Sequence, residues 1–375
     1  MKERDKIKIG LVGHGTGGHF YGVIAVAESI NKQHKDAELV FFGPDEYDSE
    51  ALEQNNINFS WVPAGKMRNY LSWLNVVDIF KIIFGFIIAF FKLLFHYPDV
   101  IFSKGGYAAF PVLVAARLLF IPIVIHDSDI VPGRVSLISE KWAKRVALAW
   151  PQALEYVTNT HTAIVGNPIR NGLLEGSKSG GREFLRIPEE AVVLLVLGGS
   201  QGAQRINDAV ISALPKLLKN FYVIHQTGNG HIDQIIAVTN KLLDEQDKER
   251  YQAFGNLNET ALAKAYGAAD VIVTRAGAGG LFETAAIGQV PAFIVPITNS
   301  VNDHQRKNAY EYQKSGAGIV IEESNLKPDI LVKDIEDLLT DKQKYQTMKQ
   351  AAKQFSPTDA ADKIASEIIQ ITHEH

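Results

Sequence analysis

The sequence predicts an α/β protein made of two Rossmann-like halves. First, an apolar run, a glycine-rich loop and a helical pattern occur in that order twice, beginning at residues 7–12 and again at residues 192–197. Second, short apolar runs alternate with helical stretches after each start, which favours parallel, doubly wound sheets. Third, a turn-rich stretch near residues 165–180 separates the two halves and is typical of a domain boundary.

Each half contains the same kinds of element. In the first half we expect a helix at about 19–31 and strands at 39–43, 59–62, 99–103, 121–126 and 145–149. In the second half we expect a helix at 203–218 and strands at 222–226, 271–274, 292–295 and 318–321. The pattern ends in a helix at about 359–371, which could pack on either half.

Composition limits the classes of function. The chain has 375 residues, 46% hydrophobic and 21% charged, which is enough for two domains that each bury a core. The formal net charge of −4 gives no basic field for nucleic acid. Because the chain has no cysteine, disulfides and thiolate metal sites are excluded. The first residues run from a charged head into a strand and lack the apolar core of a signal peptide.

One apolar segment, residues 76–94, departs from the alternating pattern. Between Lys81 and Lys92 lie ten residues, nine apolar and one glycine, whereas a transmembrane helix needs about twenty. We expect a helix that is partly in the core and partly exposed for membrane docking, with its lysines near anionic headgroups; the alternative is a core helix. Phe86→Asp together with Phe90→Asp is then expected to reduce liposome binding and to leave folding intact.

The stretch 275–309 carries the main candidate site. A Gly/Ala loop opens a helix that contains Glu283, and a buried strand then leads to a polar loop with His304 and Gln305. Backbone N–H groups at a helix start attract a diphosphate, and a nearby carboxylate can accept hydrogen bonds from a ribose. This layout suits a nucleotide-sugar pocket; the alternative is one more βα unit with polar loops.

The first glycine loop, residues 13–18, contains G-x-G-x-x-G after a strand. The dinucleotide interpretation also needs an acid at the end of the second strand, where Asp45 comes slightly late. We therefore favour a loop that offers N–H donors and the Thr16 hydroxyl. His19, at the helix start, titrates near neutrality and suits proton removal from a hydroxyl; the alternative is a surface or capping histidine.

Three other features follow predicted strands. Two of them are loops, 198–202 and 103–107, which would lie at the carboxyl edges of the sheets, where open α/β sheets bind ligands. In the first of these loops, Ser200 offers a hydroxyl and an N–H. The carboxylates within residues 126–129 could bind a metal ion; the alternative is that Asp127 caps nearby backbone N–H groups. Arg170 could pair with a phosphate in the site; the alternative is an ordinary surface arginine.

These motifs together resemble one family. They occur in a single order along nearly the whole chain: Gly15–His19, Ser103–Tyr107, His126–Asp129 with Pro132-Gly133, Gly166–Arg170, Gly198–Ala203 and Arg275–Glu283. The chain is similar to the MurG family, the N-acetylglucosaminyltransferases that convert lipid I into lipid II in bacterial peptidoglycan synthesis. Each motif is modest, but six in register are specific.

The resemblance implies a GT-B glycosyltransferase fold, with two Rossmann-like domains facing across a cleft. Residues 1–167 would form the acceptor and membrane-associating domain and 168–355 the UDP-sugar donor domain, with the last helix, about 356–373, packing back on the first. The resemblance also implies an inverting transfer from UDP-N-acetylglucosamine (UDP-GlcNAc) to the C4 hydroxyl of the lipid I muramyl sugar, with no metal and no cofactor.

Site roles are carried over by position. His19 is the candidate catalytic base. Glu283 would hold the ribose, and Arg170 would lie near the diphosphate. The residues expected to bind donor or substrate are Thr16, Gly17, Gly18, Asp129, Arg170, Ser200, Ala278, Gly279, Gly280, Leu281, Phe282, Glu283, His304 and Gln305.

The resemblance also implies partners and a location. The partners would be UDP-GlcNAc, undecaprenyl-linked lipid I, an anionic membrane and other cell-wall enzymes, and not nucleic acid. The enzyme would be peripheral on the cytoplasmic side of the cell membrane and would serve cell-wall biogenesis, cell shape and cell division. The alternatives are another GT-B enzyme, with a different acceptor or a UDP-sugar epimerase activity, and a non-catalytic nucleotide-sugar-binding scaffold.

The sequence departs from the family pattern at four places. Asp129 stands where asparagine is common, Asp127 where glutamate is common and His304 where glutamine is common; residues 279 and 280 are both glycine. These changes bear on donor-sugar contacts and on the shape of the donor loop, and not on the type of reaction.

Overall fold

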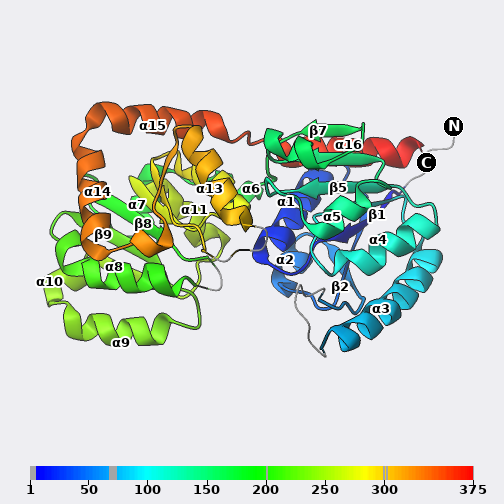
Figure 1. The fold of residues 1–375 in the computed structure, drawn as a ribbon, viewed down its shortest axis with the longest axis horizontal. Helices are drawn as coiled ribbons and strands as arrows, with labels where there is room; N and C mark the ends of the chain where they lie inside the picture. The colour runs from blue at the N-terminus through cyan, green and yellow to red at the C-terminus, as the bar shows by residue number, and fades with distance from the viewer. Residues whose placement is uncertain (1–5, 67–73, 200–201, 299, 301–302, 375) are drawn as a thin grey trace. The chain divides into compact units, whose positions relative to one another are not determined.

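The structure is a computed structural model that describes residues 6–66, 74–199, 202–298, 300 and 303–374. The chain forms two compact units (Figure 1): unit 1 is Met1–Arg170 with Thr358–His375, and unit 2 is Asn171–Pro357. The chain therefore leaves unit 1 after Arg170 and returns to it after Pro357, whereas the sequence placed these crossings after 167 and 355.

Unit 1 is built on a parallel sheet. Among its described residues the sheet has seven strands in the order β3-β2-β1-β4-β5-β6-β7. The strands are β1 (Lys8–Val12), β2 (Glu38–Gly43), β3 (Ile57–Trp61), β4 (Val100–Ser103), β5 (Ile123–Asp127), β6 (Arg145–Leu148) and β7 (Thr162–Ile164). The inner strands are continuous apolar runs because helices cover both faces of the sheet.

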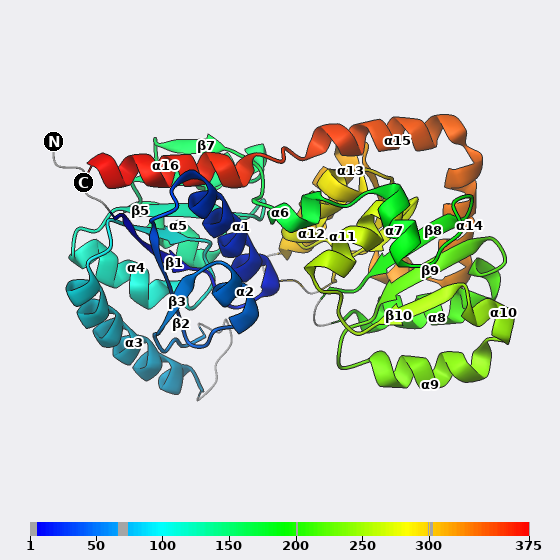
Figure 2. The same cartoon turned by 180° about the vertical axis from the view of Figure 1, so that it is seen from behind.

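Helices form the two outer layers of unit 1: α1 (Gly17–Gln33), α2 (Ser49–Gln54), α3 (Leu74–His96), α4 (Ala109–Leu118), α5 (Arg134–Ser139), a 3₁₀ turn (Pro151–Tyr156) and α16 (Ala360–Glu374). Successive side chains of a strand point to opposite faces. Ile9 and Leu11 accordingly pack in a cluster with α1 and α16, whereas Val12 packs with α3 and α4 on the other face. Figure 2 shows α16, in red, running beside α1 and the sheet.

Unit 2 repeats this arrangement. Its described residues form a six-stranded parallel sheet in the order β10-β9-β8-β11-β12-β13. The strands are β8 (Val192–Leu197), β9 (Phe221–Gln226), β10 (Tyr251–Phe254), β11 (Val271–Thr274), β12 (Ala292–Ile294) and β13 (Gly318–Val320). The helices are α6 (Asn171–Leu174), α7 (Lys178–Phe184), α8 (Gln204–Leu217), α9 (Ile232–Leu242), α10 (Glu245–Lys248), α11 (Glu259–Ala268), α12 (Ala278–Glu283), α13 (His304–Lys314), α14 (Pro328–Thr340) and α15 (Lys342–Phe355), with a π-helical turn (Thr284–Gly288) and a 3₁₀ turn (Glu323–Asn325).

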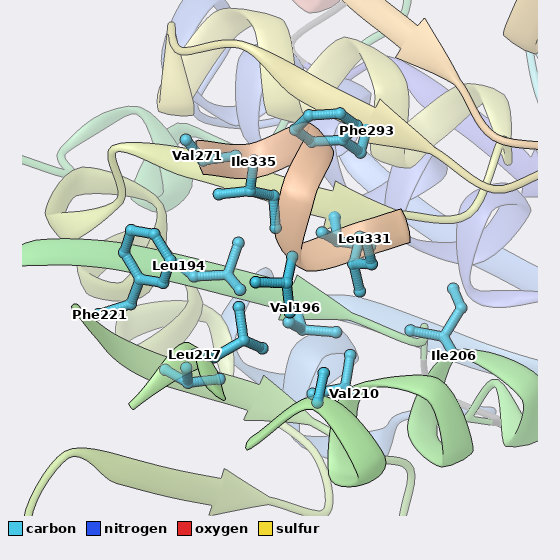
Figure 3. Packing of buried hydrophobic residues seen from close by; sticks show 14 of the residues in the cluster. Leu194, Val196, Ile206, Val210, Leu217, Phe221, Val271, Phe293, Leu331 and Ile335 are labelled. Atoms are coloured by element: carbon cyan, nitrogen blue, oxygen red, sulfur yellow. The ribbon is translucent and has the colours of Figure 1, made fainter. Parts of the chain in front are cut away.

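The core of unit 2 lies between its sheet and two helices. Figure 3 shows Leu194 and Val196 of β8 packed between Val210 of α8 and Leu331 and Ile335 of α14, and all five side chains are buried. This packing holds the carboxyl ends of β8 and β11 at one edge of the sheet, next to the start of α12.

The structure differs from the expected elements at the margins of the sheets. The edge strand β7 and strand β10 were missed, because both are largely half-buried or exposed and lack a continuous apolar run. The third strand, expected at 59–62, begins at Ile57. The π-helical turn that extends α12 was also not expected; it ends at Gly288 and is followed by Gln289, which has a φ of 50°.

Candidate active site

The first glycine loop places Thr16 and His19 at the start of α1. Thr16 is extended, with φ −148°, and it is the residue before the first turn, so its carbonyl accepts from the N–H groups of His19 and Phe20. Its hydroxyl does not cap the helix but lies 2.8 Å from His19 Nδ1. If Nδ1 donates to this hydroxyl, Nε2 carries the lone pair that a general base needs.

An aromatic cluster that the sequence did not predict surrounds this loop. His14 is 6% exposed, and its Nε2 lies 2.8 Å from an Asp45 carboxylate oxygen. Its ring meets Tyr47 and Tyr107 edge to face, with centroids 5.6 and 6.2 Å away. The only sequence signal was the pair of tyrosines, which lie in polar loops and carry no periodic pattern.

The loop of residues 103–107 lies against the first glycine loop. Gly106 has a φ of +84°, and a Cβ at this position would lie 2.1 Å from the carbonyl oxygen of His14. Only glycine permits both the conformation and this approach. The approach of the two loops therefore depends on Gly106.

Asp127 is a cap, which was one of the two interpretations offered for the acidic cluster. Its carboxylate accepts from the N–H groups of Asp129, at 3.1 Å, and Gly133, at 3.0 Å, and it is buried. Burial, together with the nearby charge of Asp129, raises the pKa of Asp127 to about 6. Within the described residues no three His, Asp or Glu side chains gather as a metal site would require.

Arg170 ends unit 1 and packs on α1. Its guanidinium carbon lies 4.1 Å from the centre of the Tyr21 ring, and the Tyr21 hydroxyl donates to Asp48 at 2.9 Å. Burial and this hydrogen bond raise the pKa of Tyr21 to about 12. The arginine is 9% exposed, so the alternative of an ordinary surface arginine is wrong.

In unit 2, hydrogen bonds hold the predicted stretch around the start of α12. Gly277 precedes α12 and offers no side-chain cap, so no side chain of that residue competes for the N–H groups of the first turn. The loop before α12 is fixed by Asn308 of α13, whose amide donates to Ala276 O at 3.2 Å. Arg275 is fixed by Glu323, at 2.7 Å. The start of α12 is therefore held from two sides.

Glu283 is the last residue of α12, and its side chain is half-buried. Tyr266, which is buried, lies beside Glu283. Burial raises the pKa of Tyr266 well above its usual range, and the charge of Glu283 adds to the shift. The tyrosine therefore stays protonated next to the carboxylate.

His304 and Gln305 begin α13. The Gln305 side chain accepts from the Ile297 N–H at 3.2 Å, and the Gln305 backbone N–H donates to the Ser300 hydroxyl at 3.2 Å. Unit 2 thus brings α12 and these two residues to the carboxyl edge of its sheet. In unit 1, the predicted site residues also lie at the carboxyl edge of the sheet: Thr16, Gly17, Gly18, His19, Asp129 and Arg170. Ser200 lies outside the described residues.

Helix α3 is partly in the core and partly exposed, as expected. Ala89 and Leu93 are buried against α4, whereas Phe80 and Phe95 are 68% and 84% exposed. We define the α3 apolar face as the exposed side chains Val76, Val77, Ile79, Phe80, Ile83, Phe84, Ile87, Phe91, Leu94 and Phe95. Within the described part of the chain, no helix has the length and hydropathy needed to cross a bilayer.

One detail of that expectation was wrong. Phe86 and Phe90 pack against the core cluster of α3 and α4 instead of lying on the α3 apolar face. Aspartates at these two positions would therefore disturb folding. A helix that is apolar nearly all round gives no periodic signal to show which phenylalanines face water.

Comparison with known proteins identifies the family to which the chain belongs. Residues 9–148 match the glycosyltransferase family 28 N-terminal domain, and residues 193–364 match its C-terminal domain. Proteins from Legionella pneumophila (strain Paris) and Clostridium perfringens (strain SM101), 35% and 33% identical, carry the name UDP-N-acetylglucosamine--N-acetylmuramyl-(pentapeptide) pyrophosphoryl-undecaprenol N-acetylglucosamine transferase. The Legionella match covers 93% of this chain and 93% of the relative, and the Clostridium match covers 91% and 92%.

A solved structure agrees with these relatives. The crystal structure of Acinetobacter baumannii MurG superimposes with a TM-score of 0.73 and 25% sequence identity, covering 97% of this chain and 99% of that one. With both domain matches, the two parallel sheets and the order of the loops in place, the chain belongs to the MurG family of glycosyltransferases, which have the GT-B fold of two Rossmann-like domains.

Proposed function

We propose that this enzyme transfers N-acetylglucosamine from UDP-GlcNAc to the C4 hydroxyl of the muramyl sugar of lipid I, forming lipid II with inversion at the anomeric carbon. The observation that carries the proposal is the identity of 33–35% over more than nine-tenths of the chain with relatives that bear the name of this transferase. The arrangement of each unit supports it independently.

Unit 2 binds the donor. The N–H groups of residues 278–282 at the start of α12, with Ser200, hold the diphosphate, because a helix start attracts negative charge. The Glu283 carboxylate, which lies next to the protonated Tyr266, accepts from the two ribose hydroxyls. His304 and Gln305 contact the donor sugar.

Unit 1 binds the acceptor and supplies the base. The C4 oxygen of the muramyl sugar forms the new bond to C1 of N-acetylglucosamine, and the bond from C1 to the β-phosphate oxygen breaks. The hydroxyl proton passes to His19 Nε2, with Thr16 accepting from Nδ1–H. Gly17, Gly18 and Asp129 line the path of the two sugars.

The leaving UDP gains negative charge as the bond breaks. We assign the stabilisation of this charge to the start of α12 and to Arg170. Each charge-assisted hydrogen bond contributes about 1.5–3 kcal/mol. Only the part of this energy that is gained as the charge develops lowers the barrier, at about 1.4 kcal/mol per factor of ten in rate.

We propose that the α3 apolar face docks on the cytoplasmic surface of the cell membrane, where the acceptor is anchored. Soluble proteins rarely leave so large a contiguous apolar patch uncovered, and Phe80 and Phe95 lie near opposite ends of this face. Lys81, on the same helix, is exposed and can reach anionic headgroups. Contact with other cell-wall enzymes would take place on the same membrane.

The test is UDP release from UDP-GlcNAc with and without a lipid I analogue. We expect release to depend on the analogue and the disaccharide product to have a β-1,4 linkage. Release that is equally fast without acceptor, or a product that is a free epimerised sugar, would contradict the proposal and favour the epimerase alternative.

A further inference from the structure

Unit 1 contains a buried lysine that the reaction described above does not use. Lys104 follows β4 and is 2% exposed. Its Nζ lies 2.8 Å from His126 Nδ1, 2.8 Å from Asn167 Oδ1 and within hydrogen-bond distance of Ser128 Oγ. An ammonium has three N–H donors, so these three acceptors satisfy it completely. Such satisfaction is what a buried charge requires.

The direction of each hydrogen bond in this cluster is fixed. The Gly166 carbonyl oxygen only accepts, and it lies 2.8 Å from His126 Nε2. The hydrogen of neutral His126 is therefore on Nε2, and Nδ1 accepts from Lys104. The Ser128 hydroxyl in turn donates to Asn167 Oδ1 at 2.7 Å. We call Lys104, His126, Ser128 and Asn167 the Lys104 cluster.

The cluster joins three segments that carry candidate site residues. Ser128 precedes Asp129, and Asn167 lies three residues before Arg170. The lysine stem also packs on α1, since a Cβ at Gly22 would lie 2.2 Å from Lys104 Cε. The helix that bears His19 thus leaves space at Gly22 for this one side chain.

We propose that Lys104 is a positioning residue for glycosyl transfer, holding the segments that carry His19, Asp129 and Arg170 in fixed relation at the carboxyl edge of the unit 1 sheet. This inference rests on the proposed function. Lys104 itself touches no substrate in this scheme. Its effect is on the barrier of the chemical step, because small misplacement of reacting groups is costly.

The charge of the cluster follows from its surroundings. Burial lowers the pKa of Lys104 to about 7, while the carboxylates of Asp127 and Asp129 oppose the shift. Burial and the ammonium lower the pKa of His126 well below its usual value, so the histidine stays neutral. His19 of α1 lies beside the same loop, since a Cβ at Gly105 would be 3.9 Å from its ring. Above about pH 7 the amine loses one of its three donors, and the positioning weakens.

The experiment compares full-length variants with UDP-GlcNAc and a soluble lipid I analogue. Lys104→Met keeps the stem and removes the ammonium, and we expect kcat to fall on the order of tenfold to a hundredfold. The KM for UDP-GlcNAc and the Kd of UDP should change less than about threefold, which is under 1 kcal/mol, since all the proposed donor contacts except that of Arg170 come from unit 2. The alkaline limb of the kcat profile should disappear.

Two further variants separate positioning from general stability. Asn167→Asp keeps the acceptor and adds a charge that raises the pKa of Lys104, so the alkaline limb should move to higher pH while activity persists. Lys8→Met is the matched control: its Nζ donates to His96 O at 3.3 Å, away from the carboxyl edge of the sheet, and kcat should stay unchanged. A Lys104→Met enzyme with wild-type kcat and pH profile would overturn the inference, as would equal losses of kcat and UDP affinity.

A spectroscopic arm distinguishes failure of this inference from failure of the proposed function. If the wild-type chain transfers no sugar to the analogue, the proposed function fails. The His126 ring can still be followed by NMR as the pH falls. It should keep the Nε2–H form in the wild type and become protonated at higher pH in Lys104→Met, since the neighbouring charge is gone. Identical titrations in the two proteins would refute the contact between Lys104 and His126.

Discussion

Replacing two exposed phenylalanines on α3 tests membrane docking without disturbing the fold. Phe80 and Phe95 are 68% and 84% exposed. Full burial of a phenylalanine side chain is worth about 1.5–3 kcal/mol, so these exposed fractions together offer roughly 3 kcal/mol if both rings leave water completely. Rings that enter only the headgroup boundary would gain about half of that. Phe80→Ser with Phe95→Ser should therefore weaken vesicle binding by about tenfold to a hundredfold.

The assay is sedimentation with vesicles of mixed anionic and neutral lipids over a range of lipid concentration. Serine adds no charge, so a change in binding cannot come from a new electrostatic repulsion with anionic lipid. Phe84→Ser and Phe184→Ser form a matched pair, because the two side chains are 55% and 52% exposed and only the first lies on the α3 apolar face. Substitutions at such exposed positions should change the free energy of unfolding by less than about 0.5 kcal/mol. Wild-type partitioning of the double variant, or an equal loss in Phe184→Ser, would refute membrane docking through this face.

Three further predictions concern the donor site, the pH dependence of stability and the packing of α1. Glu283→Ala should raise the Kd of UDP-GlcNAc by at least about tenfold in calorimetric titration, since a charge-assisted hydrogen bond is worth about 1.5–3 kcal/mol; unchanged affinity would exclude the carboxylate from the pocket. Burial lowers the pKa of His225 to about 3 from its usual 6.5. Between these two pH values the unfolded chain binds more protons than the folded chain. The free energy of unfolding therefore falls as the pH drops below 6.5, by about 2 kcal/mol at pH 5. His225→Gln should flatten this slope in urea denaturation, and a slope equal to that of the wild type would assign it to other groups. Gly22→Ala should cost about 1–3 kcal/mol of stability because its Cβ would lie 2.2 Å from Lys104 Cε. Gly230→Ala is the control and should be close to neutral, because its Cβ would have no neighbour within 4 Å. Equal thermal transitions in the two variants would contradict the close packing of Gly22.

The inner strands could be predicted because burial on both faces makes them continuous apolar runs. β8 and β11 have the predicted bounds, and both lie inside the unit 2 sheet. The edge strand β7 could not be found in this way, since its side chains are half-buried or exposed. Sequence reasoning thus located the loops that follow the inner strands and missed one edge strand of each sheet, β7 and β10.

The Lys104 cluster shows why part of the unit 1 site could not be predicted. The sequence marked the loop that contains Lys104, yet the acceptors of its ammonium come from residues 22 to 63 positions away. No local pattern encodes which buried acceptors a lysine will meet. The aromatic contacts of His14 have the same origin, because Tyr47 and Tyr107 reach it from separate loops.

The return of the chain to unit 1 determines when each unit can be completed during synthesis. Helix α16 supplies Ile364, Ala365, Ile368 and Ile371 to a core that it shares with β1 and α1. Ribosomes add about 5–20 residues per second, so Asn171–Pro357, the 187 residues between (357 − 171 + 1), take roughly 10–40 s to emerge. For that time the apolar surface of β1 and α1 that α16 covers stays exposed in the nascent chain. The unit that is encoded second can finish folding first, and the one that is encoded first waits for the last helix.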